Sequence, residues 1–403
     1  MNNVDQSSNK PKIIEIFIVF LSLGLSSFGG PIAHLGFFNR ELVLKRKWLD
    51  SQLFSELIAL CHFLPGPSSS QVGLSIGFIK GGFSGALAAW VGFTTPSAVI
   101  LIIFGYIYSS YSNSIPFGLI HGLKIFAVAI VAHAIWTMAS VFCRNSKCVL
   151  IAIMVALIVT LSPAPMFQFM AIIISAIIGT FIFTTNEDNA ENSFANLGKI
   201  STATILLVSF FLILFSLPIL ANFLSNPVLI LVDSFYRAGS FVFGGGHVVL
   251  PLLQGEVVAS GLVTNEAFLA GYGAAQAMPG PLFTFAAYLG TVSGSYPNGI
   301  LGGIIALCAI FFPSFLLVIG VLPFWHKLRQ ILLFRRAIIG INAAVVGILI
   351  AAFISPVATN GLLSVHDFIA ALAFFVLIHF FKIPIWGLVI LASIECWIFY
   401  AIL

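Results

Sequence analysis

Long apolar runs separated by short polar segments dominate the sequence. Runs of 18 or more residues recur along the whole chain, and each can cross roughly 30 Å of hydrocarbon. The runs lack the alternation of barrel strands, so their backbone groups must be satisfied within helices. The pattern predicts full-length helices at 13–34, 82–109, 115–141, 148–162 and 165–184, with second-half partners at 227–250, 297–322, 331–354, 366–381 and 384–402. A further helix at 200–222 has no first-half partner.

The composition excludes a soluble protein. Of the 403 residues, 60% are hydrophobic and 7% are charged, whereas about a quarter of a soluble domain is charged. Most of the surface must therefore face lipid, and the polar start of the chain shows no cleavable signal. The net charge of +4 is spread over loops, without a basic block for nucleic acid. The five cysteines have no metal-ligand spacing, so we expect neither a metal nor a cofactor.

The two halves repeat an ordered set of motifs, each pair about 215 residues apart. Glu41 and Glu256 share this offset. Chance could supply one such pair, but three in register indicate a duplication. The predicted parts are a first repeat at 1–183, a polar linker with a connecting helix at 184–222, and a second repeat at 223–403. The matched motifs are Phe28-Gly29-Gly30-Pro31 with Phe243-Gly244-Gly245-Gly246, Leu64-Pro65-Gly66-Pro67 with Met278-Pro279-Gly280-Pro281, and Pro96-Ser97 with Pro313-Ser314.

The Pro-Gly-Pro motifs must break the helical segments 51–80 and 265–294, because Pro removes a donor and Gly loosens the chain. If these segments cross the membrane, the chain has about thirteen spans and the repeats are inverted. If they dip and return, it has about eleven and the repeats run parallel. The excess of Lys and Arg expected in cytoplasmic loops favours thirteen, with a cytoplasmic N-terminus. That arrangement leaves only Arg40, Lys45, Arg46 and Lys47 outside. The predicted fold is thus an all-α polytopic membrane protein of two inverted repeats.

The broken helices suit an anion. The N-terminus of a half-helix exposes unpaired N–H groups and carries about half a positive charge, and hydroxyl and amide groups follow both motifs. Glycine runs let a second backbone segment approach closely. Alternatively, these residues only kink or pack helices. The candidate substrate-binding residues are Gly29, Gly30, Pro65, Gly66, Pro67, Ser68, Ser69, Gln71, Gly244, Gly245, Gly246, His247, Gln276, Pro279, Gly280, Pro281 and Thr284.

Ionisable residues in apolar surroundings are the candidates for charge or coupling, namely Lys124, Arg237, His62 and Glu256. Each of these residues can instead have a structural role or an ordinary surface position. Arg237 and Asp233 share a helix face and can simply pair, Lys124 can snorkel, and His62 and His247 can be structural. We expect the remaining histidines at interfaces and facing lipid. Loop or interface positions are expected for Glu41, Glu56, Glu256 and Glu266, with proton coupling left open for one of them.

The ordered motifs resemble the long, two-domain form of the chromate ion transporter family. Besides the matched motifs, the resemblance includes Trp48-Leu49, Ile76-Gly77, Gly81-Gly82 and Gln276. It departs at His62, where the family pattern favours Gln, and near Leu262, where a Trp is expected. The resemblance implies export of chromate across the inner (plasma) membrane, with sulfate as a look-alike.

Three functions stay open. The first is a secondary carrier for chromate, driven by a proton or a counter-anion, because no Walker loop is present. The second is a carrier of the same fold for sulfate or another small anion. The third is an intramembrane enzyme, for which His62 with Ser68–Ser70 is the candidate cluster, although the glycine-framed nucleophile elbow is missing. The sequence also leaves open a homodimer.

Overall fold

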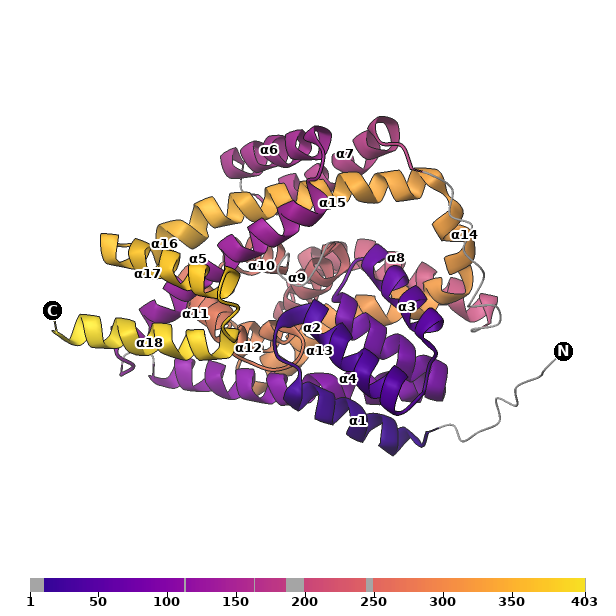
Figure 1. Cartoon of the computed structure of the whole chain (residues 1–403), viewed down its shortest axis with the longest axis horizontal. Helices are drawn as coiled ribbons and strands as arrows, with labels where there is room; N and C mark the ends of the chain where they lie inside the picture. Colours follow the sequence, from indigo (N-terminus) through magenta and orange to yellow (C-terminus); the bar gives the residue numbers. More distant parts are fainter. Residues whose placement is uncertain (1–10, 112–113, 163, 186–198, 244–248, 403) are drawn as a thin grey trace.

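The computed structural model describes residues 11–111, 114–162, 164–185, 199–243 and 249–402, and the ordered elements in these ranges are helices (Figure 1). The predicted all-α fold is confirmed. The first half contains α1 (Ile13–Ser26), α2 (Gly30–Phe38), a π-helical segment (Asn39–Lys45), α3 (Ser51–Phe63), α4 (Ser68–Tyr111), α5 (Phe117–Phe142), α6 (Ser146–Leu161) and α7 (Pro165–Ile182), and α8 (Ile200–Leu224) follows it. The second half contains α9 (Pro227–Phe241), α10 (Val249–Leu253), a π-helical segment (Gln254–Val258), α11 (Asn265–Ala275), a 3₁₀ turn (Leu282–Thr284), α12 (Phe285–Thr291), α13 (Gly299–Val321), a 3₁₀ turn (Leu322–Phe324), α14 (Trp325–Gln330), α15 (Leu332–Ala352), a π-helical segment (Phe353–Ala358), α16 (Thr359–Gly361), α17 (Val365–His379) and α18 (Ile385–Ile402).

The first hairpin corrects a sequence prediction. The predicted helix 13–34 is two helices, because Gly29 and Gly30 have φ angles of 102° and 79° and reverse the chain between α1 and α2. At the far end of the hairpin, Arg46 lies 3.2 Å from Glu15 at the start of α1. The basic cluster Arg40–Lys47 therefore lies at the same end of the molecule as the start of α1, not at the opposite end as predicted.

A second hairpin follows the first Pro-Gly-Pro motif. Within α4, Gly81 and Gly82 have non-helical backbone angles and separate a short limb, 68–80, from a long limb, 83–111. The limbs pack against each other through Gly77 and Gly85, and a Cβ atom on Gly81 would lie 2.7 Å from Ile13 at the start of α1. The segment 51–80 therefore dips inward and returns, whereas a crossing was predicted. In the second repeat, Gly290 of α12 packs against Gly302 of α13 in the same way.

The two repeats exchange their later helices. In the second repeat α15 packs on α6 and α7, and in the first repeat α5 packs on α17 and α18. Glycines permit these close approaches: a Cβ atom on Gly122 of α5 would lie 2.7 Å from the Cα atom of Ser393 in α18. Each repeat is thus completed by helices of the other, so the sequence repeats do not form two separate packed bodies.

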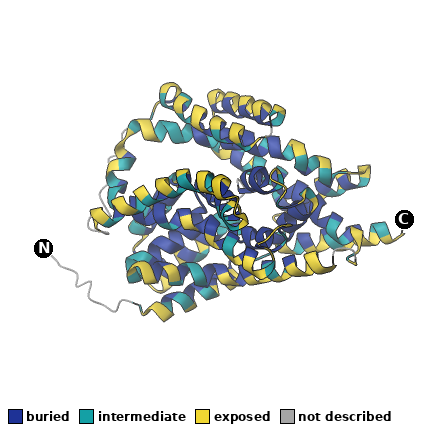
Figure 2. Ribbon diagram, turned by 180° about the vertical axis from the view of Figure 1, so that it is seen from behind, coloured by how far each residue is buried: buried dark blue, intermediate teal, exposed yellow. Residues whose placement is uncertain are grey.

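The helices suit a lipid environment. Seven of them are long and apolar enough to cross a membrane, and five apolar helices of 10–17 residues accompany them among the described residues. Exposed positions line the outer faces while buried positions gather at the centre (Figure 2). Outward side chains such as Phe181 and Phe223, each 84% exposed, are apolar, which water would disfavour. The chain is therefore a multi-pass membrane protein.

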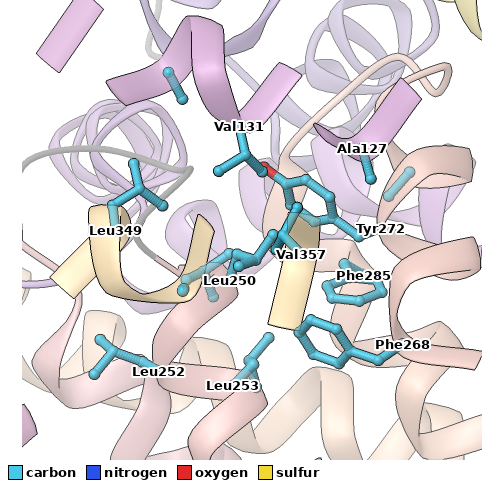
Figure 3. Close-up of a cluster of buried hydrophobic side chains, with 14 of the residues drawn as sticks. Ala127, Val131, Leu250, Leu252, Leu253, Phe268, Tyr272, Phe285, Leu349 and Val357 are labelled. Carbon is cyan, nitrogen blue, oxygen red and sulfur yellow. The ribbon is translucent and has the colours of Figure 1, made fainter. Parts of the chain in front are cut away.

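The buried core joins the repeats. Figure 3 shows Ala127 and Val131 of α5 beside Tyr272 of α11 and Val357 of the segment after α15. These side chains are almost fully buried. A close-packed core of this kind fixes the short hairpins of the second repeat in position against α5 of the first.

Candidate functional site

Each Pro-Gly-Pro motif contacts the other repeat through a backbone hydrogen bond, and the two bonds are crossed. The N–H of Gly66, in the first Pro-Gly-Pro motif, donates to the carbonyl of Val242 over 2.7 Å. The N–H of Gly280, in the second motif, donates to the carbonyl of Ser27 over 2.8 Å. Ser27 and Val242 end the first helices of their repeats, so each Pro-Gly-Pro tip caps the first hairpin of the other repeat.

The duplicated Pro-Ser pairs complete this crossed arrangement. A Cβ atom on Gly66 would lie 2.6 Å from Ser314 Oγ, and one on Gly280 would lie 3.0 Å from Ser97 Oγ. Gly66 and Gly280 have φ angles of 125° and 92°, a region that L side chains disfavour. Both motifs therefore require glycine for its conformation and for space. The Pro-Ser repeat is visible in the sequence, but Ser97 and Ser314 are not among the predicted site residues.

Helix α4 begins with buried polar side chains directly after the first motif. Ser68, Ser69 and Gln71 are nearly inaccessible to solvent. The amide of Gln71 donates 2.6 Å to the carbonyl of Pro65, so this predicted ligand holds the motif in shape. Ser69 Oγ lies 3.1 Å from Nδ1 of His34, a buried residue on α2. His34 was missed because a lone histidine in an apolar run resembles an interface residue.

Several buried donors around the tips have no hydrogen-bond partner among the described residues. They are Ser27 Oγ, Ser70 Oγ and Thr94 Oγ1. An unpartnered buried polar group costs about 1–3 kcal/mol. A hydroxyl donor left without a partner can donate a hydrogen bond to an oxyanion. The protein then needs no buried charged side chain to bind the anion.

Other predicted ligands have different surroundings. Thr284 Oγ1 donates to the carbonyl of Pro281 over 2.7 Å. Gly29 is exposed, and a Cβ atom on Gly30 would meet no atom within 4 Å. The predicted close backbone approach at these two glycines is therefore wrong, because their function is to reverse the chain. Gly244, Gly245, Gly246 and His247 lie outside the described residues. Pro67, Pro279 and Pro281 are buried in the tips, Pro65 is half-buried, and His62 is exposed.

Two acids share one arginine in the second repeat. Arg237 on α9 lies 2.9 Å from Asp233 and 2.8 Å from Glu256. Both carboxylates are buried, so the loop or interface position predicted for Glu256 is wrong. The physical reason is that the segment after α10 turns back against α9, which the sequence does not show. The predicted pairing of Asp233 with Arg237 is confirmed.

A second polar cluster surrounds Lys124. This buried lysine lies 3.5 Å from Glu266, and one turn away His121 Nε2 lies 3.0 Å from Asp367. His121 and Asp367 are completely buried, so the lipid-facing or interface position predicted for such histidines is wrong for His121 as well as for His34. This cluster joins α5 of the first repeat to α11 and α17 of the second.

Two of the cavities are lined by residues outside the Pro-Gly-Pro motifs. One of about 240 Å³ is lined by neutral polar side chains, including Gln168, Gln254 and Asn265. The other, of about 530 Å³, lies between α3 and α14 and contains Glu56 and two arginines. Neither is lined by a Pro-Gly-Pro motif. No group of three His, Cys, Asp or Glu side chains in the described part of the chain is placed to hold a metal.

Comparisons with known proteins agree with this architecture of two helical repeats in a membrane. The family model "Chromate transporter" matches twice, at residues 14–180 and 229–397. The chain therefore belongs to the chromate transporter family.

Three relatives span nearly the same length. An uncharacterized transporter of Methanocaldococcus jannaschii is 27% identical over 86% of this chain and 85% of its own. A probable chromate transport protein of Synechococcus elongatus is 26% identical over 86% and 84%, and a chromate transport protein of Pseudomonas aeruginosa is 25% identical over 83% and 79%. No solved structure matches this chain.

Proposed function

We propose that the chain is a secondary carrier that exports chromate across the inner (plasma) membrane. The observation that carries the proposal is the crossed contact of each Pro-Gly-Pro motif with the other repeat, at Gly66 with Val242 and at Gly280 with Ser27. Broken helices meeting inside inverted repeats are a recurring plan of secondary transporters. The names of the relatives from Synechococcus elongatus and Pseudomonas aeruginosa support chromate as the substrate.

The electrostatics at the tips favour an anion. Two helices of nine or more residues, α2 from Gly30 and α4 from Ser68, begin at the tips. Their unpaired N–H groups and dipoles favour negative charge there. The unpartnered donors Ser27 and Thr94 add directed hydrogen bonds. A tetrahedral dianion offers acceptors in several directions, so chromate and sulfate both fit this chemistry, and sulfate is the alternative substrate.

The hairpins also support an arrangement in the membrane. Since α1–α2 and the segment 51–80 return to the end from which they start, the remaining helices of the first repeat, α4 beyond Gly82, α5, α6 and α7, make an even number of crossings. The single helix α8 then inverts the second repeat, giving nine crossings in place of thirteen. Because Arg40–Lys47 lie at the same end of the molecule as the start of α1, this arrangement puts them on the cytoplasmic side together with the N-terminus, as the excess of basic residues in cytoplasmic loops favours.

The cluster Asp233–Arg237–Glu256 is the best candidate for coupling. Two buried carboxylates with one arginine leave one negative charge in excess, and burying it is costly. Binding a proton removes that cost, so the cluster suits exchange of a proton for the anion. A counter-anion is the alternative coupling partner.

The test compares chromate accumulation in cells that express the wild type or the double variant Gly66→Leu, Gly280→Leu. We expect lower accumulation with the wild type than with empty vector, and loss of the difference in the variant, because leucine cannot occupy either tip. Excess sulfate should reduce the wild-type effect if sulfate uses the same path. Gly387→Leu is the matched control, because a Cβ atom at Gly387 meets nothing within 4 Å. Equal accumulation in wild-type and vector cells, with the protein present in the membrane, would reject chromate export.

A further inference from the structure

One histidine lies between two carboxylates where α17 meets α18. His366 is the second residue of α17, and its ring nitrogen Nε2 lies 2.7 Å from Oε1 of Glu395 on α18. The other ring nitrogen, Nδ1, lies 3.5 Å from Oδ1 of Asp367. The ring also stacks on Phe399 of α18, with centroids 3.6 Å apart. Since both nitrogens face an acid, a proton gained by this ring meets a negative charge on either side, which favours the charged form.

The carboxylate of Asp367 connects this histidine to the core. Asp367 is completely buried, and its second oxygen, Oδ2, lies 3.0 Å from Nε2 of His121, which is completely buried on α5. The nearby base Lys124 lies 3.5 Å from Glu266. While both imidazoles are neutral, Asp367 therefore has no cationic side chain within ion-pair distance among the described residues. Burying a carboxylate in that state is costly, and a proton on His366 offsets the cost.

A proton can reach His366 from water. The side chain of Glu395 is 37% exposed and that of His366 is 25% exposed, whereas Asp367 is inaccessible. Glu395 can take a proton from water at Oε1 and pass it to Nε2 of a neutral His366 ring that carries its own proton on Nδ1. The transfer leaves Glu395 a carboxylate again and makes His366 an imidazolium, whose Nδ1–H faces Asp367.

Asp367 also has a structural function, which must be separated from proton binding. Its Oδ2 accepts hydrogen bonds from the backbone N–H groups of Leu363 and Ser364, and so it caps the start of α17. A cap uses neither histidine. Its other oxygen, Oδ1, is buried and has no hydrogen-bond partner in the described part of the chain. Asp367→Asn keeps an oxygen for the cap but removes the charge, so this substitution distinguishes the two functions.

The elements packed around the cluster contribute, in the described part of the chain, a further charged pair and three weak acids. The pair is Lys124 of α5 with Glu266 of α11, and it is neutral overall. The weak acids are uncharged at neutral pH and do not compete with an imidazole for a proton there. They are Cys396 and Tyr400 of α18 and Tyr108 of α4.

The position of the cluster suits protons that come from outside the cell. In the proposed arrangement of nine crossings, α5 and α17 begin on the external side and α18 ends there. Figure 1 shows α17 and the C-terminus at the left, at the opposite end of the molecule from α14. A carrier that exports an anion in exchange for protons receives those protons from the external side.

The cluster also lies where the two repeats meet. Helix α5 of the first repeat packs on α11, α17 and α18 of the second. Helix α11 packs in turn against the segment Gln254–Val258, which carries Glu256. A proton bound at His366 is thus placed to change the contact between the repeats, one helix away from the cluster around Arg237.

We propose that His366, held between Glu395 and Asp367, takes up the coupling proton from the external side. The inference rests on the proposed function for the exchange of a proton with the anion, and it adds the residue and the side at which the proton enters. Ionisable side chains at membrane depth are costly and mark proton pathways in many carriers. Glu395 delivers the proton, and Asp367, oriented by the cap and by His121, stabilises the imidazolium.

The first experiment measures initial rates of chromate uptake into inside-out membrane vesicles, whose lumen contacts the external face of the protein. Acidifying the lumen, at constant pH of the medium, should raise the rate in the wild type. The response should be lost in His366→Gln and in Asp367→Asn, and reduced in Glu395→Gln, whose partly exposed position makes misfolding a minor concern.

The matched control is His379→Gln, at the other end of α17, where the ring packs against Phe375 and Trp136. This variant should keep the response to the pH of the lumen. A response in His366→Gln equal to that of the control would overturn the proposal. A response that persists in Asp367→Asn would show that Asp367 only caps α17, which also overturns it.

A second experiment does not depend on transport. The protein, labelled with ¹⁵N in its histidine rings, is placed in lipid vesicles, and the signals of His366 are assigned by their loss in His366→Gln. Between about pH 8 and pH 5, where an imidazole changes its charge, this ring should become an imidazolium. Glu395→Gln should require a more acidic medium, because a negative charge beside Nε2 is removed, whereas Glu15→Gln at the other end of the molecule should change nothing. A ring that stays neutral throughout, or that responds equally to both substitutions, would overturn the proposal.

The combined outcomes separate this proposal from the proposed function. Protonation of His366 that depends on Glu395, in a chain that moves no chromate, would keep the proton site and reject the proposed substrate. Chromate transport with an unchanged response to lumen pH in His366→Gln would keep the proposed function and reject the proton site. Chromate transport that ignores the pH of the lumen even in the wild type would assign coupling to a counter-anion, which also overturns the proton site.

Discussion

Glu41 and Glu256 occupy matched positions in the two repeats, each in a π-helical segment after the second helix. In both clusters two acids contact one arginine, but at Glu41 the side chain of Lys45 adds a second base. Glu41 is 22% exposed and lies 2.7 Å from Arg46, which also contacts Glu15. Glu256 is only 3% exposed and lies 2.8 Å from Arg237. Both glutamates lie on a π-helical backbone, so the surroundings decide what each cluster contributes. The exposed cluster is screened by water, while the buried one carries an excess charge.

The largest expected contrast is in stability, between Arg237→Ala and Arg46→Ala. Removing Arg237 leaves two buried carboxylates without a cation, which should cost about 3–5 kcal/mol. Removing Arg46 breaks exposed pairs worth about 0–1 kcal/mol. Thermal unfolding of the purified variants in detergent measures the difference. Similar losses in the two variants would mean that the buried cluster already holds a proton and needs no cation.

The next contrast lies at the tips, between Gly66→Ala and Gly280→Ala. Both glycines have positive φ angles, and a side chain there should cost about 1–3 kcal/mol. Gly66→Ala should cost more, because its methyl group would also collide with the Gln71 amide that donates to the Pro65 carbonyl. The same unfolding measurement tests this, with Gly387→Ala as a control in open space. A larger loss at Gly280 would show that the crossed tips are not held by Gln71.

The duplication was predictable because three motif pairs stand in register, and the helices were predictable because apolar runs of that length have few alternatives in lipid. The chain reversal at Gly29–Gly30 was signalled by glycines within an apolar run, but glycine equally serves packing. Gly81–Gly82 was ambiguous for the same reason. The crossed contact of Gly66 with Val242 was not predictable, since it depends on how one repeat sits against the other.

Glu256 shows the same limit for the site. Its neighbours Gln254 and Gly255 make the segment polar enough to resemble a loop. Its partner Arg237 lies on a different helix, α9, earlier in the chain. The partner of Ser69, His34, lies on a different helix. Sequence patterns within one helix predict pairs such as Asp233 with Arg237, whereas pairs between helices depend on packing.

The comparison also predicts a difference in coupling. Glu256→Gln keeps a polar group beside Arg237 but removes the excess charge, so a proton would no longer be taken up there. Transport in vesicles should lose its response to an imposed pH gradient, whereas Glu41→Gln should keep it, because Glu41 is partly hydrated and paired with two bases. A pH response that survives in Glu256→Gln would assign coupling to a counter-anion.

The smallest expected effects concern the duplicated serines, and they separate structure from binding. Ser314 Oγ lies 3.5 Å from Gln71 Nε2, across the repeats, while Ser97 Oγ donates to the carbonyl of Thr94 in its own helix. If both serines are structural, Ser314→Ala should cost about 0.5–1 kcal/mol and Ser97→Ala should be nearly neutral, with KM unchanged in both.

If both hydroxyls instead contact the anion, each variant should raise KM to a similar degree while stability stays close to that of the wild type. The two repeats would then contribute equally to the substrate site although they differ in charge around Glu41 and Glu256. Measuring KM and unfolding on the same two variants therefore decides whether the symmetry of the backbone at the tips extends to the chemistry of binding. A rise in KM for one serine alone would show that the anion contacts the two repeats unequally.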